Sequence, residues 1–289
     1  MLSRRTLLVG SLLALPVLPG PRAMAEDREG TLRRRLADLE SRYGGRLGVA
    51  ALDTATGRPV AQRGDELFPL CSTFKFLAAA FVLARVDRGE ESLDRRISYS
   101  KAALVPYSPI TGKHVSDGLT LGEICAAAIT LSDNTAGNLM LDSFGGPAGL
   151  TAYLRSLGDK VTRLDRREPD LNEAAPGDPR DTTTPLAMLE ILRQTVLGTA
   201  LSAASRAQLT AWLIGCRTGD KRLRAGVPKT WRVGDKTGTG GHNATNDVAV
   251  LWPPDRPPLI VTAYYVDARG SDEERSGALA AVGRLAAAM

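Results

Sequence analysis

The alternation of apolar and polar residues predicts strands near both ends of the chain and helices between them. Residues 31–43 place leucines on one face and arginines on the other, the pattern of an amphipathic helix. Residues 47–52 and 59–62 flank a Thr56-Gly57 turn and predict a strand hairpin. Helical patterns dominate residues 72–212, for example at 121–129, 147–157 and 185–197, before strands at 231–237, 247–252 and 259–266 and a closing helix at 273–288.

This order predicts an α+β fold with two lobes. One sheet would be assembled from the two ends of the chain, flanked by helices, and a helical lobe would be inserted between its strands. We expect a sheet-containing lobe at about residues 26–68 and 213–289 and a helical lobe at about 69–212. A small-molecule site is expected in the cleft between two such lobes.

The first 25 residues follow a different pattern and resemble an export signal. Arg4-Arg5 precedes an apolar run over residues 7–18, and Ala23-Met24-Ala25 ends the segment with small residues. The paired arginines favour the twin-arginine route. A membrane anchor is the alternative, but the run is short and is interrupted by Pro16. We therefore expect an exported protein, periplasmic or secreted, with no membrane attachment after the signal is cleaved.

Composition and charge narrow the class of protein. The 289 residues are 43% hydrophobic and 24% charged, which suits one large domain or two interleaved lobes. Cleavage after Ala25 would remove three arginines and no acid, lowering the formal charge from +5 to +2. So small a charge gives no electrostatic reason to expect binding to nucleic acid or to a membrane surface.

The cysteines and histidines do not suggest a metal site. Cys71, Cys125 and Cys216 are odd in number, so at least one thiol is unpaired unless it links two chains. They form no C-x-x-C motif, and His114 and His242 are the only histidines. We expect three buried structural thiols, no metal and no cofactor.

A serine and a lysine stand at the start of a strongly apolar helix. Residues 76–86 are apolar nearly all round, which predicts a helix buried in the core, with Lys75 in its first turn. Ser72 lies three residues earlier, on the same helical face, beside the partial positive charge of the helix N-terminus. This arrangement suits a serine nucleophile. Alternatively, Ser72 caps the helix and Lys75 extends to solvent.

Two further motifs contain groups that could bind or protonate a ligand. Ser132-Asp133-Asn134 follows a helical run, where an N-cap is the default interpretation. The segment Lys236-Thr237-Gly238-Thr239, followed by two more glycines, ends a predicted strand and could be a simple turn. Its glycines could instead let a ligand backbone lie along the strand edge, with Lys236 and Thr237 meeting an anionic group.

Taken together, S-x-x-K, S-D-N and K-T-G in this order resemble the serine β-lactamases and penicillin-binding proteins. The resemblance extends from about Leu32 to the end of the chain. It implies the two-lobed β-lactamase/transpeptidase-like fold with an antiparallel sheet, a single catalytic domain over residues 26–289, and a monomer without cofactor that acts on β-lactams.

The irregular segment between residues 163 and 181 resembles the omega loop of class A β-lactamases. Glu168 and Asn172 have the E-x-x-x-N spacing of that family, and the resemblance implies a cis Glu168–Pro169 bond. A penicillin-binding protein stops at the acyl-enzyme, whereas a β-lactamase needs a carboxylate that activates water. Glu168 is the expected base and Asn172 the residue that helps to hold the water. Alternatively, the loop is a solvated segment in which Arg166 and Asp181 merely pair.

Other positions gain roles through the same resemblance. Tyr107 matches the aromatic wall of the cleft, although it could simply pack in a turn. Arg222 matches an arginine that binds the substrate carboxylate in some members, and Arg224 is the alternative candidate. Either side chain could instead simply be solvated at the surface. Thr245 stands where the commoner arginine would be.

Cys71 resembles a cysteine that in some members pairs with one after K-T-G-T. That position is Gly240 here, so this disulfide cannot form.

The implied mechanism has two halves. Ser72 would attack the lactam carbonyl, with Lys75 or Glu168 as base, in an oxyanion hole made by the N–H groups of Ser72 and Thr239. Ser132 would protonate the departing nitrogen, and a nearby Lys236 would favour a neutral Lys75. The expected catalytic residues are Ser72, Lys75, Ser132, Glu168 and Asn172, and the expected substrate-binding residues are Tyr107, Asn134, Arg222, Lys236, Thr237, Gly238 and Thr239.

Two other functions remain open from the sequence. One is a D-alanyl-D-alanine peptidase with the same fold, which the Glu168 and Asn172 spacing disfavours. The other is a non-hydrolytic penicillin-binding sensor, which would lack a deacylation base and would usually have a transmembrane tether.

Overall fold

The computed structural model describes residues 21–289, with side chains from Gly30 onward. The predicted export signal therefore lies outside the described residues, except for its last five positions. Those positions belong to helix α1 (Pro21–Tyr43), which begins before the amphipathic segment predicted to start at Thr31. Among the described residues, no helix is both long and apolar enough to cross a membrane.

The predicted sheet from the two chain ends is confirmed. Its five antiparallel strands lie in the order β2-β1-β9-β8-β7, so the first hairpin pairs with the last strand of the chain. The strands are β1 (Arg46–Asp53), β2 (Pro59–Gln62), β7 (Arg232–Thr239), β8 (Thr245–Trp252) and β9 (Leu259–Val266). Strand β7, which contains the K-T-G motif, lies at one edge of this sheet.

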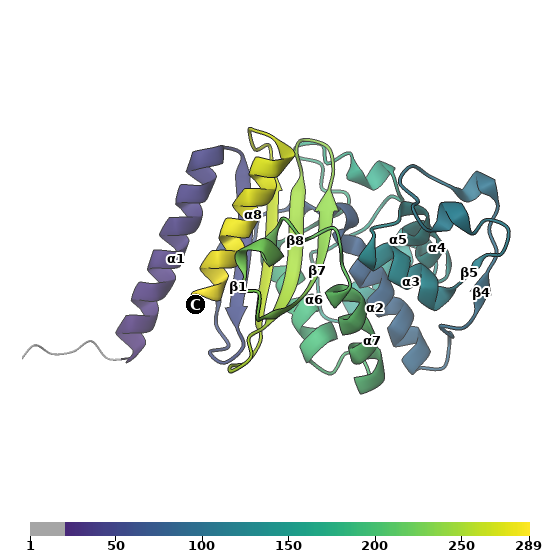
Figure 1. Ribbon diagram of the computed structural model, residues 1–289, viewed down its shortest axis with the longest axis horizontal. Coiled ribbons are helices and arrows are strands. Elements are labelled where there is room, and N and C mark those ends of the chain that lie inside the picture. Colours follow the sequence, from purple (N-terminus) through teal and green to yellow (C-terminus); the bar gives the residue numbers. More distant parts are fainter. Residues whose placement is uncertain (1–20) are drawn as a thin grey trace, which may run out of the picture.

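Both faces of the sheet are covered. Successive side chains of a strand point to opposite faces, so each strand contributes to both cores. Val49 and Ala51 of β1 belong to the core under α1 and α8 (Asp272–Ala287), two helices that lie side by side in Figure 1. Ala50 belongs to the larger core that the sheet shares with α6 (Pro185–Leu192) and the helical lobe. The sheet therefore separates two apolar cores.

The helical lobe surrounds α2, the helix that follows the S-x-x-K serine (Figure 1). Ten of the residues in α2 are buried, as expected for a helix that is apolar nearly all round. The helices of this region are α2 (Phe74–Asp87), α3 (Leu121–Thr130), α4 (Asn134–Asp142), α5 (Gly146–Ser156) and α7 (Ala203–Ile214). The helix predicted for residues 185–197 is divided into α6 and a π-helical turn, Arg193–Leu197.

Short elements complete the chain. Two-residue strands pair as β3 (Phe68–Pro69) with β6 (Thr182–Thr183) and as β4 (Arg96–Ile97) with β5 (Leu119–Thr120). Short 3-10 turns occur at Cys71–Thr73, Lys101–Ala103, Thr111–Lys113, Asp170–Asn172 and Leu223–Gly226. The first pair anchors the end of the irregular loop beside the chain that leads to Ser72.

Candidate active site

Ser72 lies in the 3-10 turn that leads into α2, and its side chain does not cap the helix. Thr73 occupies the N-cap position of α2, and no side-chain cap bond is formed there. Ser72 is 8% exposed. The Nζ of Lys75 donates to Ser72 Oγ over 2.9 Å, and Lys75 is fully buried. The alternative interpretation, in which Ser72 caps the helix and Lys75 extends to solvent, is therefore wrong.

The ammonium group of Lys75 connects the other catalytic candidates. It donates to the backbone oxygen of Ser132 at 2.8 Å and to Asn134 Oδ1 at 2.6 Å, and it lies 2.9 Å from Glu168 Oε1. A Cβ at Gly137 would stand 2.9 Å from Lys75 Cε, so a side chain at this position of α4 would force the lysine to shift. Burial lowers the pKa of Lys75, and the charge of Glu168 opposes that shift.

The Glu168 side chain points inward, toward the serine. It is 3% exposed, and its Oε1 accepts a hydrogen bond from Ser72 Oγ at 3.2 Å. Asn172 Nδ2 donates to the other carboxylate oxygen, and the Glu168–Pro169 bond is cis, as the sequence resemblance implied. The loop thus brings its carboxylate to the nucleophile.

Asn138 is a site residue that the sequence analysis did not identify. Its Nδ2 donates to the backbone oxygen of Glu168 at 2.9 Å, and its Oδ1 accepts from the Glu168 N–H at 3.0 Å. Asn138 lies one helical turn after Asn134 on α4, and this i, i+4 spacing was the available signal. The two bonds fix the backbone of the proposed base.

The S-D-N motif combines capping with site geometry. Asp133 is the N-cap of α4, where its Oδ1 accepts from Ala136 N at 2.9 Å, so the capping interpretation is confirmed for this residue. Its Oδ2 also accepts from the backbone N–H of Thr111 at 2.9 Å. Ser132 has a φ of 59°, in the left-handed region. This capped corner places the side chains of Ser132 and Asn134 against Lys75.

Lys236 approaches the same serine from the sheet. Its Nζ donates to Ser132 Oγ at 3.0 Å and to the backbone oxygen of Thr237 at 2.7 Å. Burial, together with the charge of Lys75, lowers the pKa of Lys236 to about 7. The expected repulsion between the two lysines therefore adds to burial in lowering the pKa of Lys236. The pKa of Lys75 is lowered mainly by burial.

Arg222 and Arg224 have different surroundings. Arg222 Nη1 donates to the backbone oxygen of Gly238 at 2.8 Å, and Nη2 donates to Thr239 Oγ1 at 2.7 Å. Arg224 instead points at the buried carboxylate of Asp235, with Nε 3.0 Å from Oδ1. Arg222 is thus the arginine that lies along the K-T-G strand, and neither side chain is simply solvated.

Near Arg222, a further arginine reaches the same strand pair. Arg275 of α8 is 7% exposed, and its Nε donates to Thr245 Oγ1 at 3.2 Å. Thr245 pairs directly with Thr239 in the β7–β8 ladder. Arg275 could not be identified from the sequence, because nothing in the local pattern relates a helix near the chain end to this strand.

Tyr107 lies at the outer side of the site. Its side chain is 60% exposed, and its φ is 64°. Its backbone oxygen accepts from the Asn134 N–H at 2.9 Å. The ring therefore does not pack in a turn, which was the alternative interpretation of this residue.

The three cysteines are buried and free within the part of the chain that the structure describes. Burial raises the pKa of Cys71 to about 12 and that of Cys216 to about 11. A Cβ added at Gly240 would lie 2.7 Å from Cys71 Sγ, so Gly240 does face this thiol, as the family resemblance implied.

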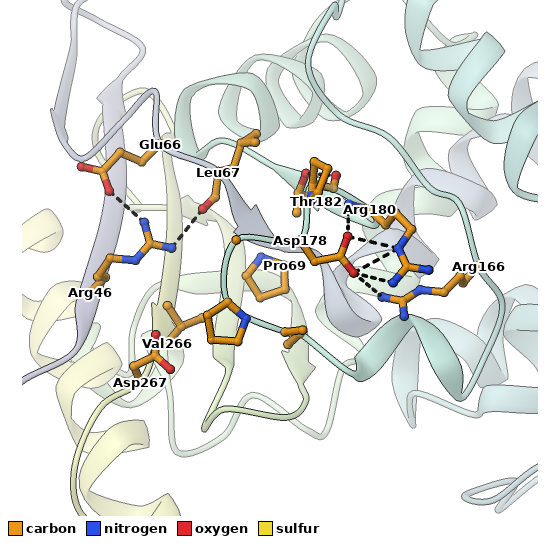
Figure 2. A pocket seen from close by; sticks show the side chains of 15 residues that line it. Arg46, Glu66, Leu67, Pro69, Arg166, Asp178, Arg180, Thr182, Val266 and Asp267 are labelled. Atoms are coloured by element: carbon orange, nitrogen blue, oxygen red, sulfur yellow. Dashed lines mark hydrogen bonds and ion pairs between the residues drawn. The ribbon is translucent and has the colours of Figure 1, made fainter.

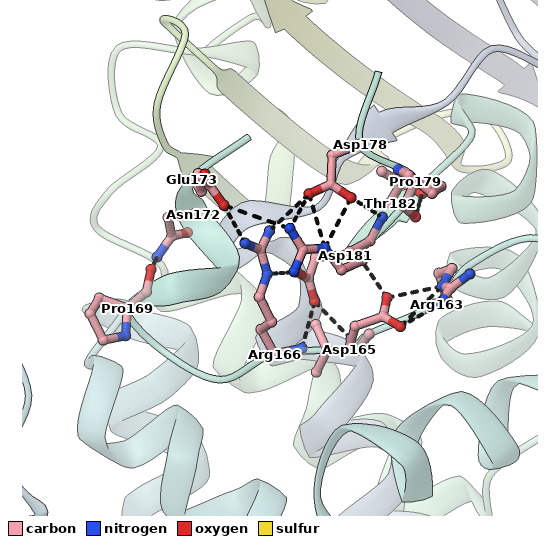
Figure 3. A network of polar contacts seen from close by, with 12 residues as sticks. Arg163, Asp165, Arg166, Pro169, Asn172, Glu173, Asp178, Pro179, Asp181 and Thr182 are labelled. Carbon is pink, nitrogen blue, oxygen red and sulfur yellow. Dashed lines mark hydrogen bonds and ion pairs between the residues drawn. The ribbon is translucent and has the colours of Figure 1, made fainter. Parts of the chain in front are cut away.

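Ionic contacts close the omega loop (Figure 3). Arg166 Nε lies 2.6 Å from Asp181 Oδ2, and Asp181 Oδ1 accepts from the backbone N–H groups of Asp165 and Arg166 at 2.7 and 2.9 Å. Arg166 also pairs with Glu173. The ion pair between Arg166 and Asp181 is therefore real, and it coexists with the contact of Glu168 to Ser72.

A cavity of about 410 Å³ lies on another side of the same loop (Figure 2). Loop residues 174–180 form one wall, and Arg46, Leu67 and Val266 contribute to the rest. Ser72 does not line it, so this cavity is separate from the catalytic candidates. Over residues 30–289, no group of three or more His, Cys, Asp or Glu side chains could hold a metal ion.

Comparisons with known proteins agree over nearly the whole chain. A family model described as the Beta-lactamase enzyme family matches residues 31–289. Beta-lactamase OXY-2 from Klebsiella oxytoca is 47% identical over 272 residues, covering 94% of this chain and 93% of the relative. Beta-lactamase L2 from Stenotrophomonas maltophilia is 48% identical over 298 residues, covering 99% and 98%.

Solved structures show the same relationship. An ancestral (GNCA) class A beta-lactamase superposes with a TM-score of 0.87 at 66% sequence identity, covering 88% of this chain and 98% of that one. A putative class A beta-lactamase, PenP from Rhodopseudomonas palustris, gives 0.88 at 61% identity, covering 89% and 99%. The chain therefore belongs to the beta-lactamase enzyme family and is a class A serine β-lactamase.

Proposed function

We propose that this β-lactamase hydrolyses β-lactams through an acyl-enzyme on Ser72 that Glu168 helps to break down. The observation that carries this proposal is the position of Ser72 Oγ, 2.9 Å from Lys75 Nζ and 3.2 Å from Glu168 Oε1. A nucleophile within hydrogen-bond reach of two groups that can accept its proton fits covalent catalysis followed by hydrolysis.

In the first half, Ser72 attacks the lactam carbonyl. Its proton passes to a neutral Lys75 or to Glu168, both of which are in contact with the hydroxyl. The backbone N–H groups of Ser72 and Thr239 stabilise the developing oxyanion. Ser132, which lies between the two lysines, protonates the ring nitrogen as the C–N bond breaks.

Substrate binding uses the K-T-G strand and the S-D-N corner. The carboxylate of the drug binds Lys236, Thr237 and Arg222, which together present cationic and hydroxyl donors along β7. Gly238 leaves room for the drug to lie along the strand edge. The side-chain amide of the drug binds Asn134, and Tyr107 forms the outer wall of the cleft.

In the second half, water attacks the ester on Ser72. Acylation removes the hydroxyl hydrogen of Ser72, so Glu168 Oε1 loses a donor and can accept a proton from water instead. Asn172 contacts the other oxygen of the Glu168 carboxylate and is close enough to help hold that water. The Glu168 carboxylate, buried and turned toward Ser72, disfavours both a peptidase that stops at the acyl-enzyme and a non-hydrolytic sensor.

The test is to separate the two halves with Glu168→Ala. We expect this variant to be acylated by a penicillin and then to stall, because no base activates water. Intact-mass measurement should show one drug mass added to the protein, and peptide mapping should place it on the peptide that contains Ser72. Rapid turnover of a chromogenic cephalosporin without an adduct would refute the role of Glu168, and Ser72→Ala is the control that should show no adduct.

We further propose that the enzyme is exported, to the periplasm or beyond the cell, as a monomer after cleavage following Ala25. It requires no metal, because all proposed steps use side chains and water. Activity should therefore persist in a chelator such as EDTA, and its loss there would contradict the proposed mechanism.

A further inference from the structure

Asn246 is a fully buried polar residue that belongs to none of the three sequence motifs. It lies on β8 and pairs with Gly238 in the register of β7 and β8, so the two positions face the same side of the sheet. Its Nδ2 donates to the backbone oxygens of Pro69 and Leu70, at 2.8 and 3.3 Å. Both hydrogens of the amide are thereby engaged with the segment that leads to Ser72.

The glycine opposite Asn246 leaves space for this contact. A Cβ at Gly238 would stand 3.2 Å from Asn246 Nδ2 and 2.9 Å from the backbone oxygen of Leu70. It would therefore press on both ends of the hydrogen bond between Asn246 and Leu70. Gly238 directly precedes Thr239, so the contact joins the end of the K-T-G strand to the turn that contains the nucleophile.

The amide of Asn246 has one orientation that suits all of its neighbours. The backbone oxygens of Pro69 and Leu70 require a donor, whereas the backbone N–H of Tyr265 donates to Asn246 Oδ1 at 3.4 Å. The backbone of the same residue is also fixed, because Arg222 Nη1 donates to Asn246 O at 2.7 Å. Asn246 is therefore held by its own strand pair while its side chain holds the turn.

The segment that Asn246 holds contains an unfavourable backbone conformation. Cys71, which follows Leu70 and precedes the nucleophile, has a φ of 44°, in the left-handed region that favours glycine. Such a conformation persists only where the surroundings fix it. The Leu70 N–H donates to Asp181 O at 2.7 Å, and Thr73 Oγ1 donates to Leu70 O at 2.7 Å. Asn246 adds the hydrogen bonds that tie this segment to β8.

We propose that Asn246 is a positioning residue for the oxyanion hole, because it sets the distance between the Ser72 N–H on the turn and the Thr239 N–H on β7. The two donors belong to segments remote in sequence, and Asn246 contacts the turn two residues before Ser72, opposite the strand residue that precedes Thr239. Donors stabilise an oxyanion when they are held where its charge develops. The inference rests on the proposed function, since the oxyanion belongs to that reaction.

The test observes the carbonyl of the acyl-enzyme directly. In Glu168→Ala, a penicillin with an isotopic label at its lactam carbonyl carbon should form a stable ester on Ser72. Subtracting the infrared spectrum obtained with the unlabelled drug isolates the C=O stretching band of this ester. Hydrogen bonds to the oxygen lower the frequency of that band. We expect Asn246→Ala in the same background to shift the band to higher frequency, because the two donors no longer converge.

The position of the band is independent of how much of the sample is folded. Only acylated molecules contribute to it, so partial unfolding lowers its intensity and does not move it. Asn246→Ser loses the same reach toward Pro69 with a smaller change in polarity, and it should give a shift in the same direction. A band that stays in place in these variants would overturn the proposal.

Asn243 provides the matched control. Its Nδ2 also donates to a backbone oxygen, that of Ala268 at 3.0 Å, which lies outside the Ser72 turn. Asn243 has a φ of 57°, so Asn243→Ala loses a hydrogen bond and places alanine in the left-handed region. This variant should be destabilised without a shift of the band. An equal shift in Asn243→Ala would mean that Asn246 acts through general loss of stability, against the proposal.

Rates provide a second readout in the enzyme that retains Glu168. Single-turnover acylation should slow by roughly 10- to 100-fold in Asn246→Ala, because the oxyanion donors are misaligned. The dissociation constant from the same traces should change little, since Lys236 and Thr237 still bind the substrate carboxylate. A loss confined to the dissociation constant would refute a role in the oxyanion hole.

The same experiments separate this inference from the proposed function. If Glu168→Ala alone forms no adduct with a penicillin, the proposed function fails. If the adduct forms and its C=O band does not respond to Asn246→Ala, the proposed function stands and the role of Asn246 is refuted.

Discussion

The site depends on single residues whose surroundings change their ordinary chemistry. A lysine is rarely fully buried, yet Lys75 and Lys236 both are, on either side of the Ser132 hydroxyl. Each is surrounded by acceptors, and burial lowers the pKa of both. The lowered pKa makes Lys75 a better proton acceptor than an exposed lysine, and it makes the charge of Lys236 depend on pH near neutrality.

The pKa of Lys236, lowered to about 7, predicts how substrate affinity depends on pH. The ammonium is present below that pH and is lost above it. KM for an anionic penicillin should therefore rise by about tenfold from pH 6 to 9, which corresponds to the loss of one charge-assisted hydrogen bond. Steady-state kinetics across this range provide the measurement. In Lys236→Arg the guanidinium keeps its charge, so its KM should vary less with pH; two identical profiles would refute the role of Lys236.

Asn138 provides a second prediction for a single residue. Asn138→Ala removes the two hydrogen bonds that fix the Glu168 backbone, so the carboxylate should be misplaced and deacylation should slow by roughly 10- to 100-fold. Acylation of Ser72 depends less on this contact. Stopped-flow traces should therefore show a burst followed by a slow steady state. A variant that slows both phases equally would instead indicate general loss of structure.

Among the elements, those with long regular patterns were predicted well. The strands β1, β2 and β9 lie within a residue or two of their predicted ends, because each alternates or is continuously apolar over its length. The two-residue strands β3 to β6 were not predicted, since so short a segment has no measurable period. The π-helical turn at Arg193–Leu197 was not predicted either, because its composition continues that of α6.

The motif residues were predicted from their order in the chain, and the partners that hold them were not. Asn138, Arg275 and Asp235 act through contacts with residues distant in sequence, and such contacts follow from the tertiary structure. Ser72 and Glu168, 96 positions apart, were brought together in prediction only by family resemblance.

The omega loop is the element whose closure is most directly testable. Asp181 is 1% exposed and receives a guanidinium and two backbone N–H groups, so Asp181→Asn should destabilise the protein by about 3 kcal/mol. Urea unfolding at neutral pH measures this loss. Asp267→Asn, on the surface, should cost less than about 0.5 kcal/mol. A loss at Asp181 no larger than at Asp267 would contradict a structural role for the ion pair.

At the scale of the whole molecule, the site is assembled where the edge of the sheet meets the start of the helical lobe. Strand β7 packs against the turn Cys71–Thr73, and a Cβ at Gly238 would stand 2.9 Å from the backbone oxygen of Leu70. The omega loop joins the same junction, since Gly241 N donates to Asn172 O at 2.8 Å. Three segments remote in sequence therefore fix one another around Ser72.

This junction predicts that a covalent link can be introduced across it. In Gly240→Cys, the new Cβ would begin 2.7 Å from Cys71 Sγ, so a disulfide should form on oxidation and join the strand edge to the helical lobe. The loop length suggests a gain of up to about 5 kcal/mol. The shift that Asn172 O must make reduces this gain, because Asn172 O also lies 2.7 Å from the new Cβ.

Counting thiols in the denatured protein checks this cross-link. The chain has three cysteines, so the oxidised variant should show two free thiols, and the reduced variant four. Gly240→Ser is the matched control, with a side chain of similar size that cannot cross-link. If four thiols titrate after oxidation, β7 and the Ser72 turn do not lie as close as described. Displacement of Asn172 should slow deacylation in Gly240→Cys and Gly240→Ser alike, because both add a Cβ beside Asn172 O and the Asn172 side chain contacts the Glu168 carboxylate.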